Sequence, residues 1–170
     1  MYVYKTAGNA PTIYYLGSGY PLITKPLSYP PLYFDGTNFI ISKTHESRIA
    51  EFVINWYKKQ ALIFVKWRVD ALSNRDGFNC GKIKIGGAKT RWGSCSSKND
   101  LSFTYKLVMA PVSVIDYVVI HELVHTTHHN HAKSFWKEVS KHCPNYKEER
   151  KWLRRHGHLL TKYDCPIFTF

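Results

Sequence analysis

The sequence predicts an α+β domain, in which a group of short strands precedes a series of helices and a second group of strands. Three observations predict this class. Residues 1–43 contain aromatic and β-branched runs separated by glycine, proline and asparagine. From about His45, apolar residues recur at helical spacing. Residues 101–107 alternate apolar and polar side chains, as a half-buried strand does.

Four short runs in residues 1–43 are expected to form strands, and their sequences are TIYYLG, YPLIT, LYF and NFIIS. The stretch DGTN lies between the last two runs and contains the Asp-Gly pair of a tight turn. The last two strands are therefore predicted to pair as a hairpin.

One long helix, or two helices joined near Gln60, is expected over residues 45–72. The polar stretch SNRDGFNCG should end it, and KIKIGG should form the next strand. AKTRWGSC and LSFTYKLVM are expected to be two further strands, joined by the polar turn SSKND.

Three helices are expected after residue 110. Pro111 suits the first turn of a helix, because proline lacks the N–H that this position leaves unpaired, and VSVIDYVVIHELVHTT follows it. AKSFWKEVSKH and YKEERKWLRRHG should form the other two helices, with Gly157 closing the last one. The tail LLTKYDCPIFTF is apolar enough to pack but has no clear period.

Length and composition predict one domain over residues 1–170, with N-terminal strands (1–43), the long helix (45–72) and a core that carries the motifs (80–157). No apolar run reaches the roughly 18 residues that cross a bilayer, and the start of the chain lacks the apolar stretch of a signal peptide. The four cysteines form no C-x-x-C pair, a pattern typical of free thiols. We therefore expect a cytoplasmic protein with no membrane partner.

The net charge of +12 favours anionic partners such as nucleic acid or nucleotides, although basic residues also keep a surface soluble. A basic stripe follows one side of the last predicted helix, near Trp152, and consists of Lys147, Lys151, Arg154 and Arg155. Such a stripe is compatible with phosphate contacts. It is equally compatible with a solvated face whose glutamates pair with lysine and arginine within the helix.

The stretch HELVHTTHHNH, from His121 to His131, contains five of the nine histidines of the chain. Residues four apart share a helix face, so His121 and His125 are placed to bind one metal ion, and zinc accepts such nitrogen ligands. Glu122 lies about 100° round the helix, where it reaches a metal-bound water without ligating the metal. Apolar neighbours predict that this helix is buried, where an unpaired carboxylate is costly unless it has a function. The structural alternative is a pair of core histidines satisfied by the backbone.

A catalytic zinc site needs a third protein ligand, and His131 is preferred. On a continuing helix His131 would lie about 9 Å further along and face away, so the helix is predicted to end near His128 and the chain to turn back. Asn130, or a neighbouring histidine at 128 or 129, is expected to take a positive φ at this turn. The other candidates for the third ligand are Glu138, Glu148 and Glu149. The histidines at 128 and 129 are then expected to be polar loop residues beside the site.

The stretch from Thr90 to Val139 resembles the YgjP-like metallopeptidase family, which is related to the SprT and WLM groups. The motifs that carry the resemblance are RWGSC (Arg91 to Cys95), HELVH (His121 to His125) and NHAKSFW (Asn130 to Trp136). The resemblance covers about residues 13–157. It implies a zincin-like domain with a small mixed or antiparallel sheet packed on an active-site helix and further helices. It also implies zinc on His121, His125 and His131, with Glu122 as the catalytic residue.

The resemblance also suggests a role for RWGSC, because in zincins a strand beside the metal helix pairs with an extended peptide substrate. Gly93 would let a substrate backbone approach closely, and Arg91 would hold an anionic group or a carbonyl oxygen. The alternative is that Trp92 packs in the core and Arg91 merely covers it.

The sequence favours a zinc-dependent hydrolase, in the first place a metallopeptidase with a metal-activated water and Glu122 as general base. A metal-dependent nucleoside triphosphate pyrophosphatase is the first alternative, because activated water also attacks phosphorus and the chain is basic. A nucleic-acid-associated zinc protein is the second alternative.

Overall fold

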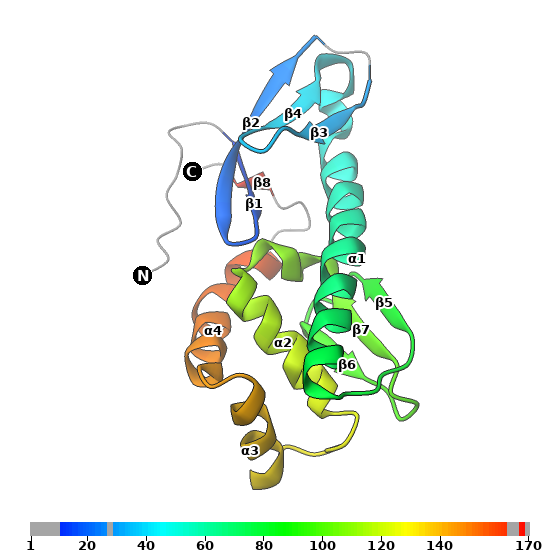
Figure 1. The fold of residues 1–170 in the computed structure, drawn as a ribbon. Coiled ribbons are helices and arrows are strands. Elements are labelled where there is room, and N and C mark those ends of the chain that lie inside the picture. Colours follow the sequence, from blue (N-terminus) through cyan, green and yellow to red (C-terminus); the bar gives the residue numbers. More distant parts are fainter. Residues whose placement is uncertain (1–10, 27–28, 163–166, 169–170) are drawn as a thin grey trace.

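The structure, a computed structural model, describes residues 11–26, 29–162 and 167–168. Two sheets and four α-helices lie within these ranges, and one long helix runs from the first sheet to the second (Figure 1). Cys165 and half of the apolar tail (residues 163–166 and 169–170) lie outside the described residues, so the structure does not address the expectations for them. The other three cysteines are free thiols, as predicted.

The first sheet contains the N-terminal strands. Its spatial order is β3 (Leu32–Phe34), β4 (Phe39–Ser42), β2 (Ser18–Lys25), β1 (Thr12–Tyr15) and β8 (Ile167–Phe168). Strands β3 and β4 are antiparallel, so the predicted hairpin is confirmed. Its turn is held by Asp35, whose Oδ1 accepts hydrogen bonds from the backbone N–H groups of Thr37 at 2.8 Å and Asn38 at 2.7 Å.

The predicted long helix forms as one unbroken element, α1 (Ile49–Asp76), after a 3-10 segment at Lys43–Arg48. One stripe of α1 is buried at spacings of three and four residues, and it consists of Val53, Tyr57, Ala61, Val65, Val69 and Leu72. The helix runs four residues past the predicted end at residue 72. It stops only at Gly77, which takes the left-handed conformation at φ 75° and donates to the Ser73 carbonyl.

The second sheet is mixed and small. Strand β5 (Ile83–Gly86) runs parallel to β7 (Leu101–Thr104), and β6 (Gly93–Cys95) runs antiparallel to β7. Both strands predicted around the RWGSC motif are shorter than expected. The alternation predicted through Leu107 fails after Thr104, where the chain enters a buried 3-10 segment, Tyr105–Met109. Lys106 is buried there, and its ammonium group donates a hydrogen bond to the carbonyl of Thr161 at 3.2 Å, which compensates for its burial.

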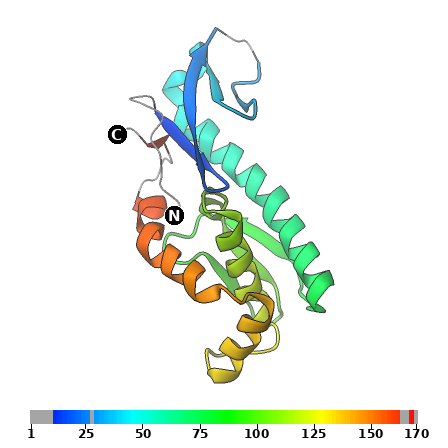
Figure 2. The same cartoon turned by 60° about the vertical axis from the view of Figure 1, so that its left-hand side comes forward.

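Helices α2 (Val112–Val124), α3 (Lys133–His142) and α4 (Tyr146–Lys162) complete the described fold (Figures 1 and 2). Pro111 directly precedes α2, and its carbonyl accepts the first helical hydrogen bonds, as its position in the sequence predicted. Nine of the 13 residues of α2 are buried, because it packs against α1, α4 and β6 at once. The α+β class and the mixed sheet packed on this helix are therefore confirmed.

Gly157 does not close the last helix, contrary to the prediction. Helix α4 continues to Lys162, and Gly157 lies buried inside it. A Cβ atom at this position would lie 2.9 Å from Cζ2 of Trp92. The glycine therefore serves close packing of α4 on the indole, and not the left-handed conformation that ends a helix.

None of the helices in the described residues is both long enough and apolar enough to cross a membrane.

We predict that Tyr57→Phe lowers the free energy of unfolding by about 1 kcal/mol. Tyr57 is fully buried in α1, and its hydroxyl donates to the backbone carbonyl of Tyr14 in β1. The substitution removes this donor and with it the hydrogen bond between α1 and β1. Urea unfolding measures the change, and Tyr29→Phe is the control because Tyr29 is 84% exposed. Equal effects of the two substitutions would contradict the prediction.

Candidate metal centre

Three histidines predicted as ligands lie together at the C-terminal end of α2. His121 is in the last turn of the helix, His125 caps it, and His131 returns from the loop that leads to α3. Nε2 of His131 lies 3.1 Å from Nε2 of His121 and 3.2 Å from Nε2 of His125. One ring nitrogen from each of the three lies within 4.8 Å of the others.

The chain turns back between His125 and His131 as predicted, but by a different device. The α-helix ends at Val124, and the carbonyl of Val124 then accepts hydrogen bonds from the N–H groups of residues 127 and 128 at 3.1 and 2.9 Å. The hydroxyl of Thr126 donates to the Leu123 carbonyl at 2.6 Å. The prediction of a positive φ at Asn130 or a neighbouring histidine is wrong. Outside glycine, the described residues with positive φ are Leu16 and Asn99.

The donor atoms of the cluster fit a divalent metal. Nδ1 of His125 lies 2.9 Å from the carbonyl of His128, and because a carbonyl only accepts, this nitrogen carries the proton. The lone pair of His125 is therefore on Nε2, which faces the other two rings. A tetrahedral ion with Zn–N bonds of 2.0–2.1 Å separates its nitrogen ligands by about 3.3 Å. The observed separations of 3.1 and 3.2 Å are close to this value.

The surroundings of the cluster favour neutral imidazoles, which is the form that binds metals. Burial, together with the neighbouring His125 and His131, lowers the pKa of His121 to about 3. Burial also lowers the pKa of His125.

Glu122 belongs to α2 and is 6% exposed, and its side chain lies against strand β6. Burial raises the pKa of its carboxyl group to about 7, and the positive charge of Arg91 opposes this shift. A Cβ atom added to Gly93 would lie 2.7 Å from Oε1 of Glu122. The missing side chain at Gly93 therefore makes room for the glutamate, a role that the sequence did not suggest.

Two hollows meet at Glu122. The larger, of about 590 Å³, is lined by Arg91, residues 93–97 of and after β6, Glu122 and the histidines at 121, 125, 129 and 131. The smaller, of about 210 Å³, is lined by Trp92, Gly93, Tyr117, Val118, His121, Glu122 and Leu153. The three histidines, Glu122, Arg91 and Gly93 thus border one cleft, and His129 lies beside it as predicted.

Two residues that line this region were not identified from the sequence. Tyr117 lines the smaller hollow one turn before His121, and burial raises the pKa of its hydroxyl to about 12. Its position four residues before His121 on the same helix was a signal that could have found it. Trp92 also lines this hollow and contacts α4 at Gly157, which no local pattern indicates.

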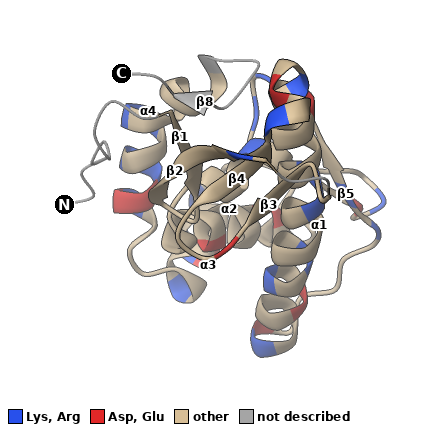
Figure 3. Ribbon diagram, turned by 90° about the horizontal axis from the view of Figure 1, so that it is seen from above, with Lys and Arg blue, Asp and Glu red and all other residues tan. Residues whose placement is uncertain are grey.

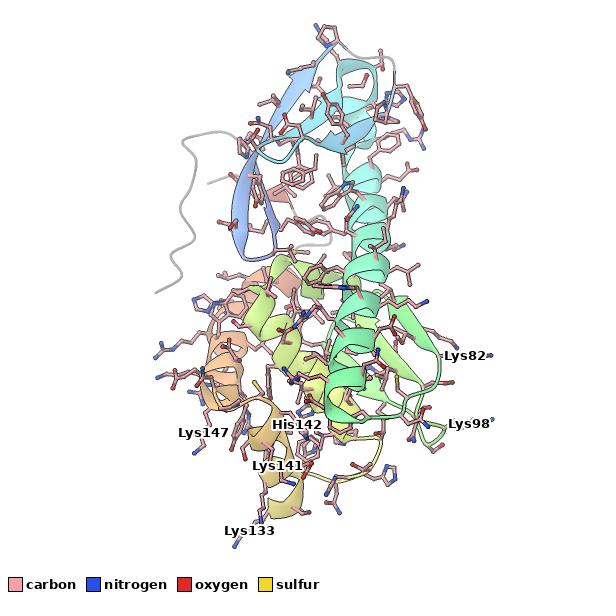
Figure 4. The ribbon with its side chains drawn as sticks, viewed as in Figure 1. Lys82, Lys98, Lys133, Lys141, His142 and Lys147 are labelled. Atoms are coloured by element: carbon pink, nitrogen blue, oxygen red, sulfur yellow. The ribbon has the colours of Figure 1, made fainter. Side chains whose placement is uncertain are left out.

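The glutamates considered as alternative third ligands lie elsewhere. Glu138 accepts hydrogen bonds from Lys141 at 2.5 Å and pairs with His142 at 3.1 Å, and both partners are labelled in Figure 4. Glu149 accepts from the hydroxyl of Ser113 at 3.2 Å. Glu148 lies on the exposed face of α4 among basic residues. In the described part of the chain, none of the three belongs to the histidine cluster.

Residues 4–156 match the family described as YgjP-like, metallopeptidase domain. The crystal structure of the metallopeptidase zymogen of Pyrococcus abyssi abylysin is similar, with 22% identity and a TM-score of 0.48 over 54% of this chain and 93% of that one. The zymogen of Methanocaldococcus jannaschii jannalysin shows 21% identity and a TM-score of 0.44 over 54% and 95%. No curated protein matches the chain.

We predict that Gly93→Ala lowers the free energy of unfolding by about 1–3 kcal/mol, because the new methyl group overlaps the Glu122 carboxylate. Gly86→Ala is the matched control, since it lies in the same sheet with nothing within 4 Å of an added Cβ. In a Glu122→Ala background the cost at Gly93 should shrink towards that of the control. Denaturant unfolding of the variants measures this. An equal cost at Gly93 in both backgrounds would refute the contact as its cause.

Proposed function

The chain belongs to the family of YgjP-like metallopeptidase domains, and from this premise we propose that it is a zinc-dependent peptidase. His121, His125 and His131 are the proposed ligands, and Glu122 is the proposed general base. One observation carries the proposal. Three imidazole nitrogens converge within 4.8 Å of one another, and a buried carboxylate with no hydrogen bond from any described residue borders the same cleft.

The proposed ligands suit zinc more than a harder cation. Three imidazoles without a carboxylate are a ligand set that zinc accepts and that calcium and magnesium do not favour. Because all three are neutral, they would leave the full charge of the ion at the site. Zinc in such a site supplies Lewis-acid chemistry, since it lowers the pKa of water and polarises the carbonyl group under attack.

Glu122 is suited to move the proton in this reaction. A general base works best when its pKa lies near the working pH, and burial brings the pKa of this carboxyl group to about 7. We propose that Glu122 accepts the proton of the attacking water and donates it to the leaving amine. Its carboxylate lies against Gly93 beside the cleft and does not belong to the histidine cluster.

The cleft offers two contacts for a peptide substrate. Arg91 is exposed at its wall and is proposed to hold a carbonyl oxygen or a carboxylate of the substrate. Strand β6 is at the edge of the second sheet and passes beside Glu122. An extended peptide is proposed to pair with this edge. Gly93 would then serve both the substrate backbone and, on its other side, the glutamate.

The two alternative functions have weaker support. Lys and Arg are spread over α1, α4 and the region near β5 (Figure 3). On α4, Lys147, Arg150, Lys151 and Arg154 border one hollow together with Glu148. Trp152 is only 9% exposed, so it does not offer a face on which a nucleic-acid base could stack. The stripe therefore fits a solvated helix face better than a nucleic-acid surface.

We predict one zinc ion per chain, and its loss when His121, His125 or His131 is replaced by alanine. Two remaining nitrogen ligands are too few for tight binding. Elemental analysis after dialysis against dilute chelator measures the stoichiometry. His158→Ala is the control, because His158 is exposed on α4 and outside the cluster. Stoichiometric zinc in all three ligand variants would contradict the site.

We predict that Glu122→Gln keeps the zinc and the fold but loses activity by about 10²–10⁴-fold, the usual contribution of a general base. The amide has nearly the same shape but does not accept the proton. The assay compares casein with nucleoside triphosphates such as UTP, with the same zinc-loaded protein. Cleavage of casein supports the peptidase, whereas cleavage of UTP alone would replace it by the pyrophosphatase. Full activity of the variant would make Glu122 structural.

A further inference from the structure

The three proposed ligands are held in place by different means. His125 donates from Nδ1 to a backbone carbonyl, which fixes its ring. His121 belongs to the buried helix α2, where Tyr117 and Phe135 pack edge-on against its ring with centroids 5.9 and 4.9 Å away. His131 lies on an exposed loop, and in the described chain no hydrogen bond reaches its Nδ1. A hydrogen bond from the ring nitrogen that does not bind the metal normally orients a ligating histidine.

Aromatic rings surround His131 in place of such a partner. The indole of Trp136 stacks on its imidazole, with centroids 5.7 Å apart and planes 27° apart. Phe135 meets the same imidazole edge-on at 4.7 Å. Both aromatic residues belong to the first turn of α3, which begins two residues after His131.

Helix α4 in turn fixes the indole. Tyr146 stacks on Trp136 with centroids 5.5 Å apart and planes 20° apart. The guanidinium of Arg150 lies 4.9 Å from the centroid of the same indole, in a cation–π contact. Tyr146 and Arg150 are four residues apart and so share one face of α4. Figures 1 and 2 show α3 and α4 following each other at this end of the molecule.

We propose that Trp136 is a positioning residue that holds His131 in its ligand orientation. Its flat ring replaces the hydrogen bond that usually performs this task, and α4 braces it through Tyr146 and Arg150. This inference deepens the proposed function and depends on its metal site. Without the stacked ring, the exposed imidazole would populate several rotamers, and the site would have to order it each time a metal binds.

The test compares zinc affinity in Trp136→Leu, Trp136→Phe and the wild type, measured by competition with a chromophoric chelator. We expect Trp136→Leu to bind zinc roughly 10–100-fold more weakly, the usual effect of losing a partner that orients a ligand. Trp136→Phe retains a flat ring and should recover part of the loss. Trp67→Leu is the matched control, because Trp67 is 55% exposed on α1 and outside the cluster.

A second background separates positioning from general packing, since Trp136 also lies 5.8 Å from the ring of His121. In a His131→Ala background, Trp136→Leu should cause no further loss of zinc affinity. The same loss in both backgrounds would overturn the proposal, because the indole would then act through His121 or the fold. Wild-type affinity in Trp136→Leu would overturn it as well.

The outcomes also distinguish this inference from the proposed function. If the wild type binds no zinc, the metal site itself is wrong and the positioning role is lost with it. If the wild type binds zinc and only the Trp136 variants behave unexpectedly, the ligands stand and the role of Trp136 is refuted. Thermal unfolding of each variant in the absence of metal is recorded alongside, and Trp136→Phe, which keeps an aromatic ring in the site, decides the case if Trp136→Leu is unfolded.

Discussion

The close approach of helix α2 to strand β6 is the constraint on which the rest of the site depends. Glu122 projects from α2 into the space that a side chain at Gly93 would fill, so helix and strand approach as closely as a glutamate permits. Trp92, the residue before Gly93, packs instead on α4, where its ring fits against Gly157. Two glycines far apart in the sequence therefore set the spacing of α2, β6 and α4 around one carboxylate.

This packing explains how a costly group is kept in the core. A buried carboxylate without a hydrogen-bond partner destabilises a fold unless it is neutral or functional. The described residues provide Glu122 with no hydrogen bond, and the nearby charge of Arg91 only partly offsets its burial. The surrounding core compensates, because α2 is buried against α1, α3, α4 and β6. Proteins commonly retain such unfavourable groups at the places where they act.

The sequence predicted the elements whose signals lie in neighbouring residues. It did not predict features that depend on contacts between residues far apart in the chain. The histidine spacing, the Asp-Gly hairpin and the long helical period each depend on near neighbours, and the helices and the hairpin that they predicted are present, although α1 begins and ends four residues later than expected. Gly157 was taken for a helix stop because the residue that requires it, Trp92, lies 65 positions earlier in the chain. Lys106 was assigned to the polar side of a half-buried strand, but it is buried and donates to the carbonyl of Thr161 in the distant helix α4. The turn before His131 lacked glycine, and hydrogen bonds to the end of α2 proved sufficient for it.

Helix α1 has a consequence for how the molecule can move. Its 28 residues form one unbroken rod of roughly 40 Å, buried along one stripe from the first sheet to the second. No glycine or proline interrupts it, so the two ends of the molecule lack a hinge at this connection. The cleft is bordered by two short connections, the loop between α2 and α3 and the turn between β6 and β7. Because α1 connects the two sheets without a hinge, a change in the width of the cleft would have to arise in these two segments and not in a movement of one sheet against the other.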